Sequence, residues 1–127
     1  MNLLVIDSDK ETADLLCEYL QDSGHQCLAV NNGRNALEAL NKNQYDVTFL
    51  ELDMPELSGY GIIDELARTG KIDKQNIIIL TACDKISDTQ ISELKNKGVR
   101  SYFRKPLDID FLANVLDAGL KFEKHNE

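Results

Sequence analysis

Five short, mostly apolar runs divide the chain into a repeating pattern. They cover residues 3–6, 26–30, 47–50, 77–80 and 99–103. A strand with one solvated face alternates apolar and polar residues, whereas a strand buried on both faces is apolar throughout. The runs therefore predict five strands of a parallel sheet that is covered on both sides.

Segments with apolar residues at helical spacing separate these runs. In the first, Ala13, Leu16, Cys17 and Leu20 recur with the helical period and predict a helix over residues 10–22, ended by Gly24. The other helices are expected from about residue 32 to 40, over residues 59–67, from Ser87 to residue 97, and from Asp108 to about residue 122.

Alternating strands and helices predict an α/β fold, a doubly wound parallel sheet with helices on both faces. Each connection is long enough for a right-handed crossover. In such folds the functional crevice lies at the carboxyl ends of the strands. Four strands end there in polar residues, Asp7, Glu51, Thr81 and Lys105, so we expect these side chains to converge.

Length and composition narrow the classes of function. A chain of 127 residues predicts one domain over residues 1–127. The net charge of −8 argues against direct binding of nucleic acid. No apolar run approaches the ~18–20 residues that span a membrane, and no signal peptide is visible. Cys17, Cys27 and Cys83 are odd in number and lack metal-site spacing, which favours reduced thiols and a cytoplasmic location.

Five motifs at the predicted strand ends carry a family resemblance. They are Leu4-Val5-Ile6-Asp7, Glu51-Leu52-Asp53-Met54-Pro55, Gly59, Leu80-Thr81-Ala82 and Lys105-Pro106. In this order the chain resembles a response-regulator receiver domain of the chemotaxis-receiver type over residues 2–120. The resemblance implies a flavodoxin-like fold with strand order 2-1-3-4-5 and five helices. It also implies a role in two-component or phosphorelay signalling.

The same resemblance shows that the phosphoacceptor position is altered. In the family an Asp ends the third strand and accepts a phosphoryl group from a histidine kinase. A Met-Pro pair follows, and a Gly comes four residues after the Pro. Pro55 and Gly59 fix this register and place Glu51, not Asp, at the phosphoacceptor position. The chain thus resembles a receiver in which phosphorylation is altered or absent.

The metal-binding positions of the family are altered as well. An acidic pair after the first strand holds Mg²⁺ in typical receivers, and it aligns with Asp7 and the neutral Ser8. We therefore expect Mg²⁺ to bind weakly or not at all, and no other cofactor is expected. In a plainer interpretation Asp7 and Ser8 are turn and N-cap residues, with Asp9 supporting the first helical turn. Asp53 is expected to offer a backbone carbonyl or a solvated carboxylate at the rim of this acidic pocket.

Three further residues align with the switch of receiver domains. The resemblance implies that Thr81 contacts the phosphoryl group and that Lys105, before a cis proline, aims its ammonium at the phosphoacceptor. Tyr102 aligns with an aromatic residue whose rotamer reports activation. In plainer interpretations Thr81 and Tyr102 are strand residues and Lys105 is a solvated loop lysine. We expect an ion pair between Lys105 and Glu51.

Glu51 has three interpretations that the sequence leaves open. Its charge lies one carbon–carbon bond, roughly 1.5 Å, further from the backbone than that of Asp. The side chain would then partly imitate a phosphorylated aspartate and bias the switch. Alternatively, it neutralises Lys105 and fixes one state. The third interpretation is a glutamate introduced deliberately as a phosphomimic.

The function expected from the resemblance is that of a non-enzymatic signalling module. It would bind a histidine kinase or a downstream effector through the fourth helix, fifth strand and fifth helix. It would act alone or as the N-terminal domain of a longer regulator, and self-association into a homodimer is left open. One alternative is a phosphorylatable receiver in which Glu51, Asp53 or Asp9 accepts phosphate. Another is a flavodoxin-like cofactor binder, although Ser8-Asp9-Lys10 is not a phosphate-binding loop.

Overall fold

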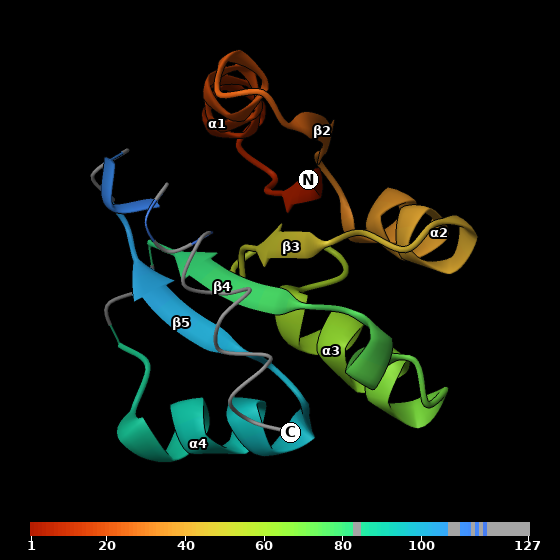
Figure 1. The fold of residues 1–127 in the computed structure, drawn as a ribbon. Helices are drawn as coiled ribbons and strands as arrows, with labels where there is room; N and C mark the ends of the chain where they lie inside the picture. Colours follow the sequence, from red (N-terminus) through yellow and green to blue (C-terminus); the bar gives the residue numbers. More distant parts are fainter. Residues whose placement is uncertain (83–84, 107–109, 113, 115, 117–127) are drawn as a thin grey trace.

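A single parallel sheet forms the centre of the molecule. The computed structural model describes residues 1–82, 85–106, 110–112, 114 and 116. The strands pair in the order β2-β1-β3-β4-β5, all parallel, which confirms the predicted fold class and strand order (Figure 1). Their bounds are β1 Asn2–Ile6, β2 Gln26–Val30, β3 Val47–Leu50, β4 Ile77–Thr81 and β5 Ser101–Arg104.

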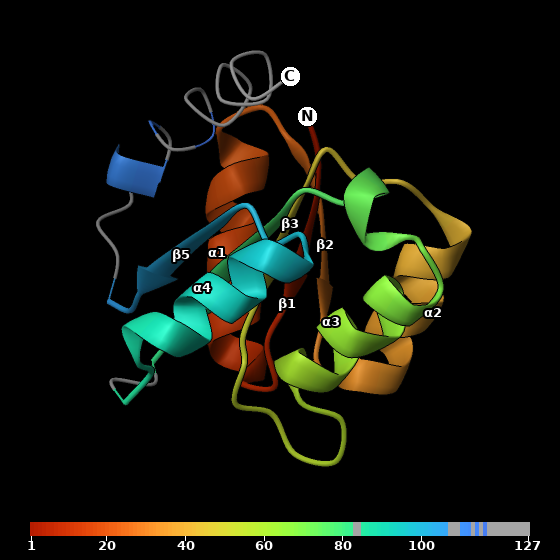
Figure 2. The same ribbon diagram turned by 90° about the horizontal axis from the view of Figure 1, so that it is seen from below.

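Helices cover both faces of this sheet. They are α1 Lys10–Asp22, α2 Gly33–Lys42, α3 Gly59–Arg68 and α4 Asp88–Lys97, with a short 3-10 helix η1 at Ile72–Lys74. In Figure 2, α3 and α4 lie in front of the strands and α1 lies behind them. Residues 110–112, 114 and 116 are also helical, where the fifth helix is expected, whereas its predicted cap Asp108 lies outside the described residues.

Two apolar clusters fill the space between the sheet and the helices. One lies on the side of α2, α3 and α4 and includes Leu50, Ile63 and Leu94. The other lies on the side of α1 and includes Phe49 and Leu112. Neighbours in β3 alternate between the two clusters because side chains alternate across a strand. This explains why the central strands β1, β3 and β4 are almost entirely buried.

Most predicted helix boundaries are confirmed, and the largest error in a strand boundary is at the start of the fifth strand. Ser87 caps α4 and forms a reciprocal capping box with Gln90. The fifth strand was expected to begin at Val99, but β5 begins at Ser101. The Val99 N–H still donates to the Leu94 carbonyl, because Gly98, with φ of 126°, turns the chain at the end of α4.

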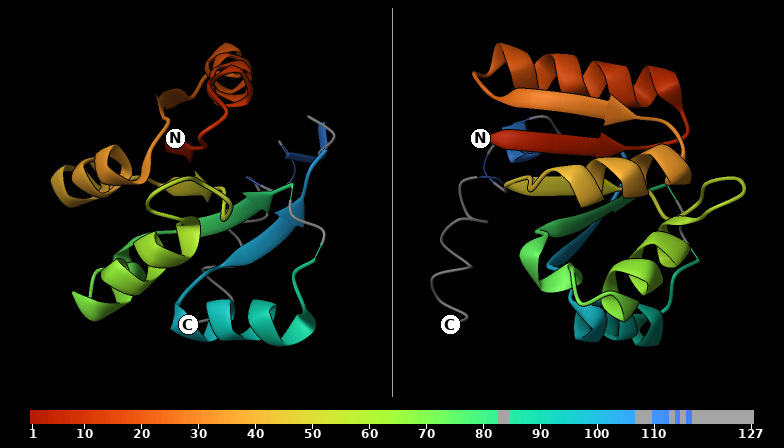
Figure 3. Two further views of the ribbon diagram at one scale, coloured as in Figure 1. Left: turned by 180° about the vertical axis from the view of Figure 1, so that it is seen from behind. Right: turned by 90° about the vertical axis from the view of Figure 1, so that its right-hand side faces the viewer.

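The loop after β3 brings α3 close to the end of that strand. It projects beyond the arrowheads of β1 and β3 (Figure 3). The Gly59 N–H donates to the Leu52 carbonyl at 3.0 Å. A Cβ atom on Gly59 would lie 2.7 Å from the Leu52 Cα and would collide with the Glu51 carbonyl. A glycine is therefore required where α3 begins against the backbone of Glu51.

No helix among the described residues combines the length and apolar character needed to cross a membrane.

Candidate functional site

Polar side chains from four strands meet at the carboxyl edge of the sheet, as expected. Asp7 follows β1, Glu51 follows β3, Thr81 ends β4 and Lys105 follows β5. The Lys105 N–H donates to the Thr81 carbonyl at 2.9 Å, which brings the end of β5 beside β4. Asp7 and Glu51 are each only 5% exposed, and Thr81 is fully buried. The edge therefore holds two carboxylates that are largely removed from water.

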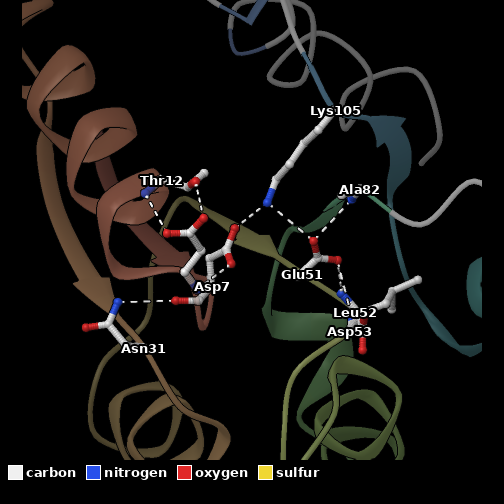
Figure 4. Close-up of polar contacts among 9 residues, drawn as sticks. Asp7, Thr12, Asn31, Glu51, Leu52, Asp53, Ala82 and Lys105 are labelled. Atoms are coloured by element: carbon white, nitrogen blue, oxygen red, sulfur yellow. Dashed lines mark hydrogen bonds and ion pairs between the residues drawn. The ribbon is translucent and has the colours of Figure 1, made fainter.

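Lys105 is the cation that both carboxylates face (Figure 4). Its ammonium lies 3.3 Å from Glu51 Oε1, so the predicted ion pair is present. The same ammonium also contacts Asp7 Oδ2, and more closely. The Lys105-Pro106 peptide bond is cis. Lys105 thus bridges the ends of β1 and β3, rather than forming a pair with Glu51 alone.

Backbone N–H groups surround the Glu51 carboxylate on its remaining sides. Oε2 accepts hydrogen bonds from the N–H of Leu52 at 2.7 Å and of Asp53 at 3.3 Å. Oε1 accepts from the N–H of Ala82 at 3.1 Å. These donors come from the loop after β3 and from the residue after β4 (Figure 4). The site is therefore built to hold an anion, and the anion is the side chain of Glu51.

The electrostatics of this arrangement favour the charged form of each group. Burial raises the pKa of Glu51, but hydrogen bonds from the Thr81 side chain and the Ala82 N–H, with the charge of Lys105, hold this pKa below its usual value. Burial lowers the pKa of Lys105, but its contact with Asp7 and the charges of both carboxylates raise this pKa above its usual value. Glu51 and Lys105 are therefore both ionised at neutral pH.

Asp9, and not Ser8, caps the helix that follows β1. The Asp9 carboxylate accepts from the Thr12 N–H at 3.3 Å and from the Thr12 hydroxyl at 2.9 Å. The hydrogen bond from the Thr12 side chain lowers the pKa of Asp9. The plainer interpretation of Ser8 as the N-cap is thus wrong. Because a carboxylate already occupies the start of α1, this helix end does not suit an anionic cofactor.

The remaining predicted residues lie at the margins of the site. Asp53 is exposed, in agreement with the expected solvated carboxylate, and its backbone N–H donates to the Glu51 carboxylate at 3.3 Å. Tyr102 in β5 packs against the core cluster on the side of α3 and α4, and its hydroxyl is buried. The aromatic ring therefore has an inward position. The switch roles of Thr81, Tyr102 and Lys105 stay predictions.

The side chains at this edge do not match a magnesium site. Among the described residues, no group of three His, Cys, Asp or Glu side chains is arranged to hold a metal ion. Asp7 and Glu51 both face the Lys105 ammonium, and Ser8 brings no charge. A divalent cation would have to displace that ammonium. The residues present therefore fit a lysine bridge better than a metal ion.

Sequence reasoning missed the backbone donors of Leu52, Asp53 and Ala82. Every residue carries an N–H group, so no residue type marks these positions. The position of Glu51 at the end of β3 could have indicated these donors, because a side chain there faces the loops that follow β3 and β4.

Known proteins resemble this chain over most of its length. The family model for the response regulator receiver domain matches residues 3–117. The chain is 33% identical over 106 residues to the transcriptional regulatory protein PcoR of Escherichia coli, covering 84% of this chain and 45% of PcoR. It is 32% identical over 121 residues to sporulation initiation phosphotransferase F of Bacillus subtilis, covering 94% of this chain and 91% of that protein.

A solved receiver domain has the same fold as this chain. The receiver domain of the Francisella response regulator 1452 superimposes with a TM-score of 0.82 at 29% identity, covering 95% of this chain and 97% of that domain. The chain spans less than half of PcoR, whereas it spans nearly all of the Bacillus protein and of the Francisella domain. These matches favour a receiver over a flavodoxin-like cofactor binder.

Proposed function

This chain belongs to the response regulator receiver family, and we propose that Glu51, rather than phosphorylation, sets its signalling state. Receiver domains are signalling modules of two-component systems that interact with histidine kinases and effectors. In this proposal the Glu51 carboxylate takes the place of a phosphoryl group. The chain then signals without phosphoryl transfer, by binding other proteins in the cytoplasm.

The set of donors around Glu51 is the observation that supports this proposal. The carboxylate accepts from the N–H groups of Leu52, Asp53 and Ala82 and pairs with Lys105. Such donors suit any oxyanion that extends from the end of β3. Glu51 supplies one negative charge, against about −1.5 to −2 for the phosphoryl group of a phosphorylated side chain. Glu51 therefore reproduces only part of the charge of a phosphoryl group.

The same contacts make Glu51 a poor phosphoacceptor. To attack phosphorus, a carboxylate oxygen must be free to approach it in line. Oε1 is held by Ala82 and Lys105, and Oε2 is held by Leu52 and Asp53. A metal ion that would bring in the phosphodonor competes with Lys105 for the same carboxylates. Phosphorylation of Glu51 would therefore first require several hydrogen bonds of its carboxylate to break.

Ala82 connects this site with the surface proposed for partners. Its N–H donates to Glu51, and the segment that follows leads to α4. We place partner binding on the face of α4, β5 and the helix that includes residues 110–112. A kinase or an effector protein would dock there in a state fixed by Glu51.

The proposal is tested by chemical phosphorylation. The chain is incubated with acetyl phosphate and Mg²⁺, and its intact mass is measured. We expect no stable adduct on the wild type. The double variant Ser8→Asp with Glu51→Asp should gain one phosphoryl group, because it restores the family pattern. A Mg²⁺-dependent gain on wild-type Glu51 would overturn the proposal, and a gain mapped to Asp53 or Asp9 would support relaxed phosphotransfer instead.

A further inference from the structure

Asn31 brings the end of β2 to the site, which the four strand ends described above do not include. It is the residue directly after β2, and it is half-buried. Its side-chain amide donates to the Asp7 carbonyl at 3.2 Å (Figure 4). The amide nitrogen must face this acceptor, because two carbonyl oxygens cannot share a hydrogen bond. All five strands therefore contribute a residue to this edge of the sheet.

This hydrogen bond continues the pairing of β1 with β2 beyond the ends of both strands. The Asp7 N–H donates to the Val30 carbonyl at 3.0 Å. In a continuing parallel ladder, the Asp7 carbonyl would accept from the backbone N–H of Asn32. At Asn32, however, the chain turns into α2. The Asn31 side chain supplies the donor instead, and it holds the peptide group between Asp7 and Ser8 against β2.

The same peptide group helps to orient the Asp7 carboxylate. Oδ1 accepts a hydrogen bond from the Asp9 N–H at 3.0 Å, and Oδ2 contacts the Lys105 ammonium. Ser8 alone joins the Asp7 carbonyl to the Asp9 N–H, so a rotation of the peptide group after Asp7 would move this donor. By holding the Asp7 carbonyl, Asn31 therefore also holds the N–H group that turns Oδ2 toward Lys105.

Support for the start of α2 does not explain the contact that Asn31 makes. The N-cap of α2 is the next residue, Asn32, whose Oδ1 accepts from the Asn35 N–H at 2.8 Å. Asn31 lies before the cap, and its amide donates to the loop after β1 rather than to α2. The two neighbouring asparagines therefore have different tasks, and Asn32 provides a matched control for Asn31.

From these contacts we propose that Asn31 is a positioning residue that keeps the Asp7 carboxylate on the Lys105 ammonium. It acts on Lys105 through the backbone and side chain of Asp7. Without the Asn31 amide, the Asp7 carboxylate turns away and Lys105 faces Glu51 alone. Asn31 thereby sets how one ammonium is shared between two carboxylates. The inference rests on the geometry of this edge, and it stands whether or not Glu51 replaces phosphorylation.

The rate at which Lys105 is acetylated tests this inference. The full chain is treated with a trace of acetic anhydride at about pH 8, where lysines are mostly charged and only the neutral amine reacts. Peptide mass spectra give the rate at Lys105 relative to Lys97 on α4. Burial lowers the pKa of Lys105 and the contact with Asp7 raises it, so loss of that contact increases the neutral fraction. We expect Asn31→Ala and Asn31→Leu each to raise the relative rate by about threefold or more.

Two controls distinguish positioning from a general loosening of the fold. Asn32→Ala removes the cap of α2 and should leave the relative rate of Lys105 unchanged. In a chain that carries Asp7→Asn, which weakens the contact directly, Asn31→Ala should add nothing. An unchanged rate in either Asn31 variant would overturn the proposal, as would a comparable rise in Asn32→Ala or an equal rise with and without Asp7→Asn. Should one Asn31 variant fail to fold, the other decides, and failure of both contradicts a role limited to Asp7.

Discussion

Glu51 differs from aspartate by one methylene group, and the position of its carboxylate depends on that group. Oε2 reaches back to the N–H of the next residue, Leu52, at 2.7 Å. Oε1 reaches across to Ala82 and Lys105. Only the charged form satisfies all of these contacts at once, because protonation turns one of the two accepting oxygens into a donor. Replacing Glu51 with Gln therefore removes the charge of the side chain and leaves its size nearly unchanged.

Glu51→Gln is expected to lower the free energy of unfolding by about 1–3 kcal/mol. The amide NH₂ would face the N–H donors that now bind the carboxylate, and Lys105 would lose one of its two anions. Chemical denaturation measures the change. Glu38→Gln is the matched control, because Glu38 forms an exposed pair with Lys42, and its effect should be clearly smaller.

A double-mutant cycle isolates the ion pair itself. Glu51→Gln and Lys105→Met are combined, and we expect a coupling free energy of about 1 kcal/mol or more. Asp7 keeps part of the attraction to Lys105, so the coupling is smaller than a fully buried pair would give. Additive effects of the two substitutions would show that the 3.3 Å contact does not stabilise the fold.

The stability contributed by Glu51 should depend on pH in a defined direction. The pKa of Glu51 is lower in the folded chain than its ordinary value of 4.5. The unfolded chain therefore takes up the proton first, and the contribution is complete above about pH 4.5 and is lost as the pH falls through the folded pKa. Unfolding free energies of wild type and Glu51→Gln, measured between about pH 3 and 7, should converge at the acid end. A constant difference would contradict this pKa shift.

At the scale of elements, hydrophobic pattern and caps predicted most of the fold. Apolar runs identified all five strands, and Ser87 marked the start of α4. The pattern missed η1, because three residues are too short to show a period. It placed the start of β5 two residues early because Val99 is apolar and buried, although its N–H belongs to the end of α4.

Gly59→Ala tests how closely α3 must approach β3. The new Cβ would meet the Glu51 carbonyl and the Leu52 Cα, both backbone atoms, so we expect a loss of about 1–3 kcal/mol in unfolding free energy. Gly61→Ala is the control within the same helix. The single close contact of its Cβ, at 2.6 Å, would be with the end of the Leu57 side chain, which can move. Alanine also favours the helix by up to about 1 kcal/mol. Equal effects of both substitutions would argue against the close approach.

Across the whole molecule, parallel topology determined which distant side chains meet. Asp7, Glu51, Thr81 and Lys105 were predicted together because parallel strands share a carboxyl edge. Two features of the site did not follow from topology. The closer contact of Lys105 with Asp7 and the three backbone donors to Glu51 depend on side-chain torsions and loop paths. Strand order does not fix these.

Mg²⁺ binding reports on this whole edge of the sheet. We expect calorimetry to show weak or no binding of Mg²⁺ to the wild type, because the Lys105 ammonium already forms ion pairs with the carboxylates of Asp7 and Glu51. Ser8→Asp combined with Glu51→Asp should raise the affinity by about tenfold or more, since hard cations favour additional carboxylate oxygens. The control is Asp7→Ala in that double variant, which should remove the gain. Tight wild-type binding that Asp7→Ala abolishes would show an intact metal site.

The covalent attachment of the Glu51 carboxylate to its own chain has a consequence for timing. A phosphoryl group is added and later hydrolysed, so its lifetime limits the duration of a signal. A side-chain carboxylate held by Leu52, Asp53, Ala82 and Lys105 has no hydrolysable bond. Under the proposed function, the signal would last as long as the polypeptide. Its strength would then follow the rates of synthesis and degradation, and the cell would adjust it through protein abundance.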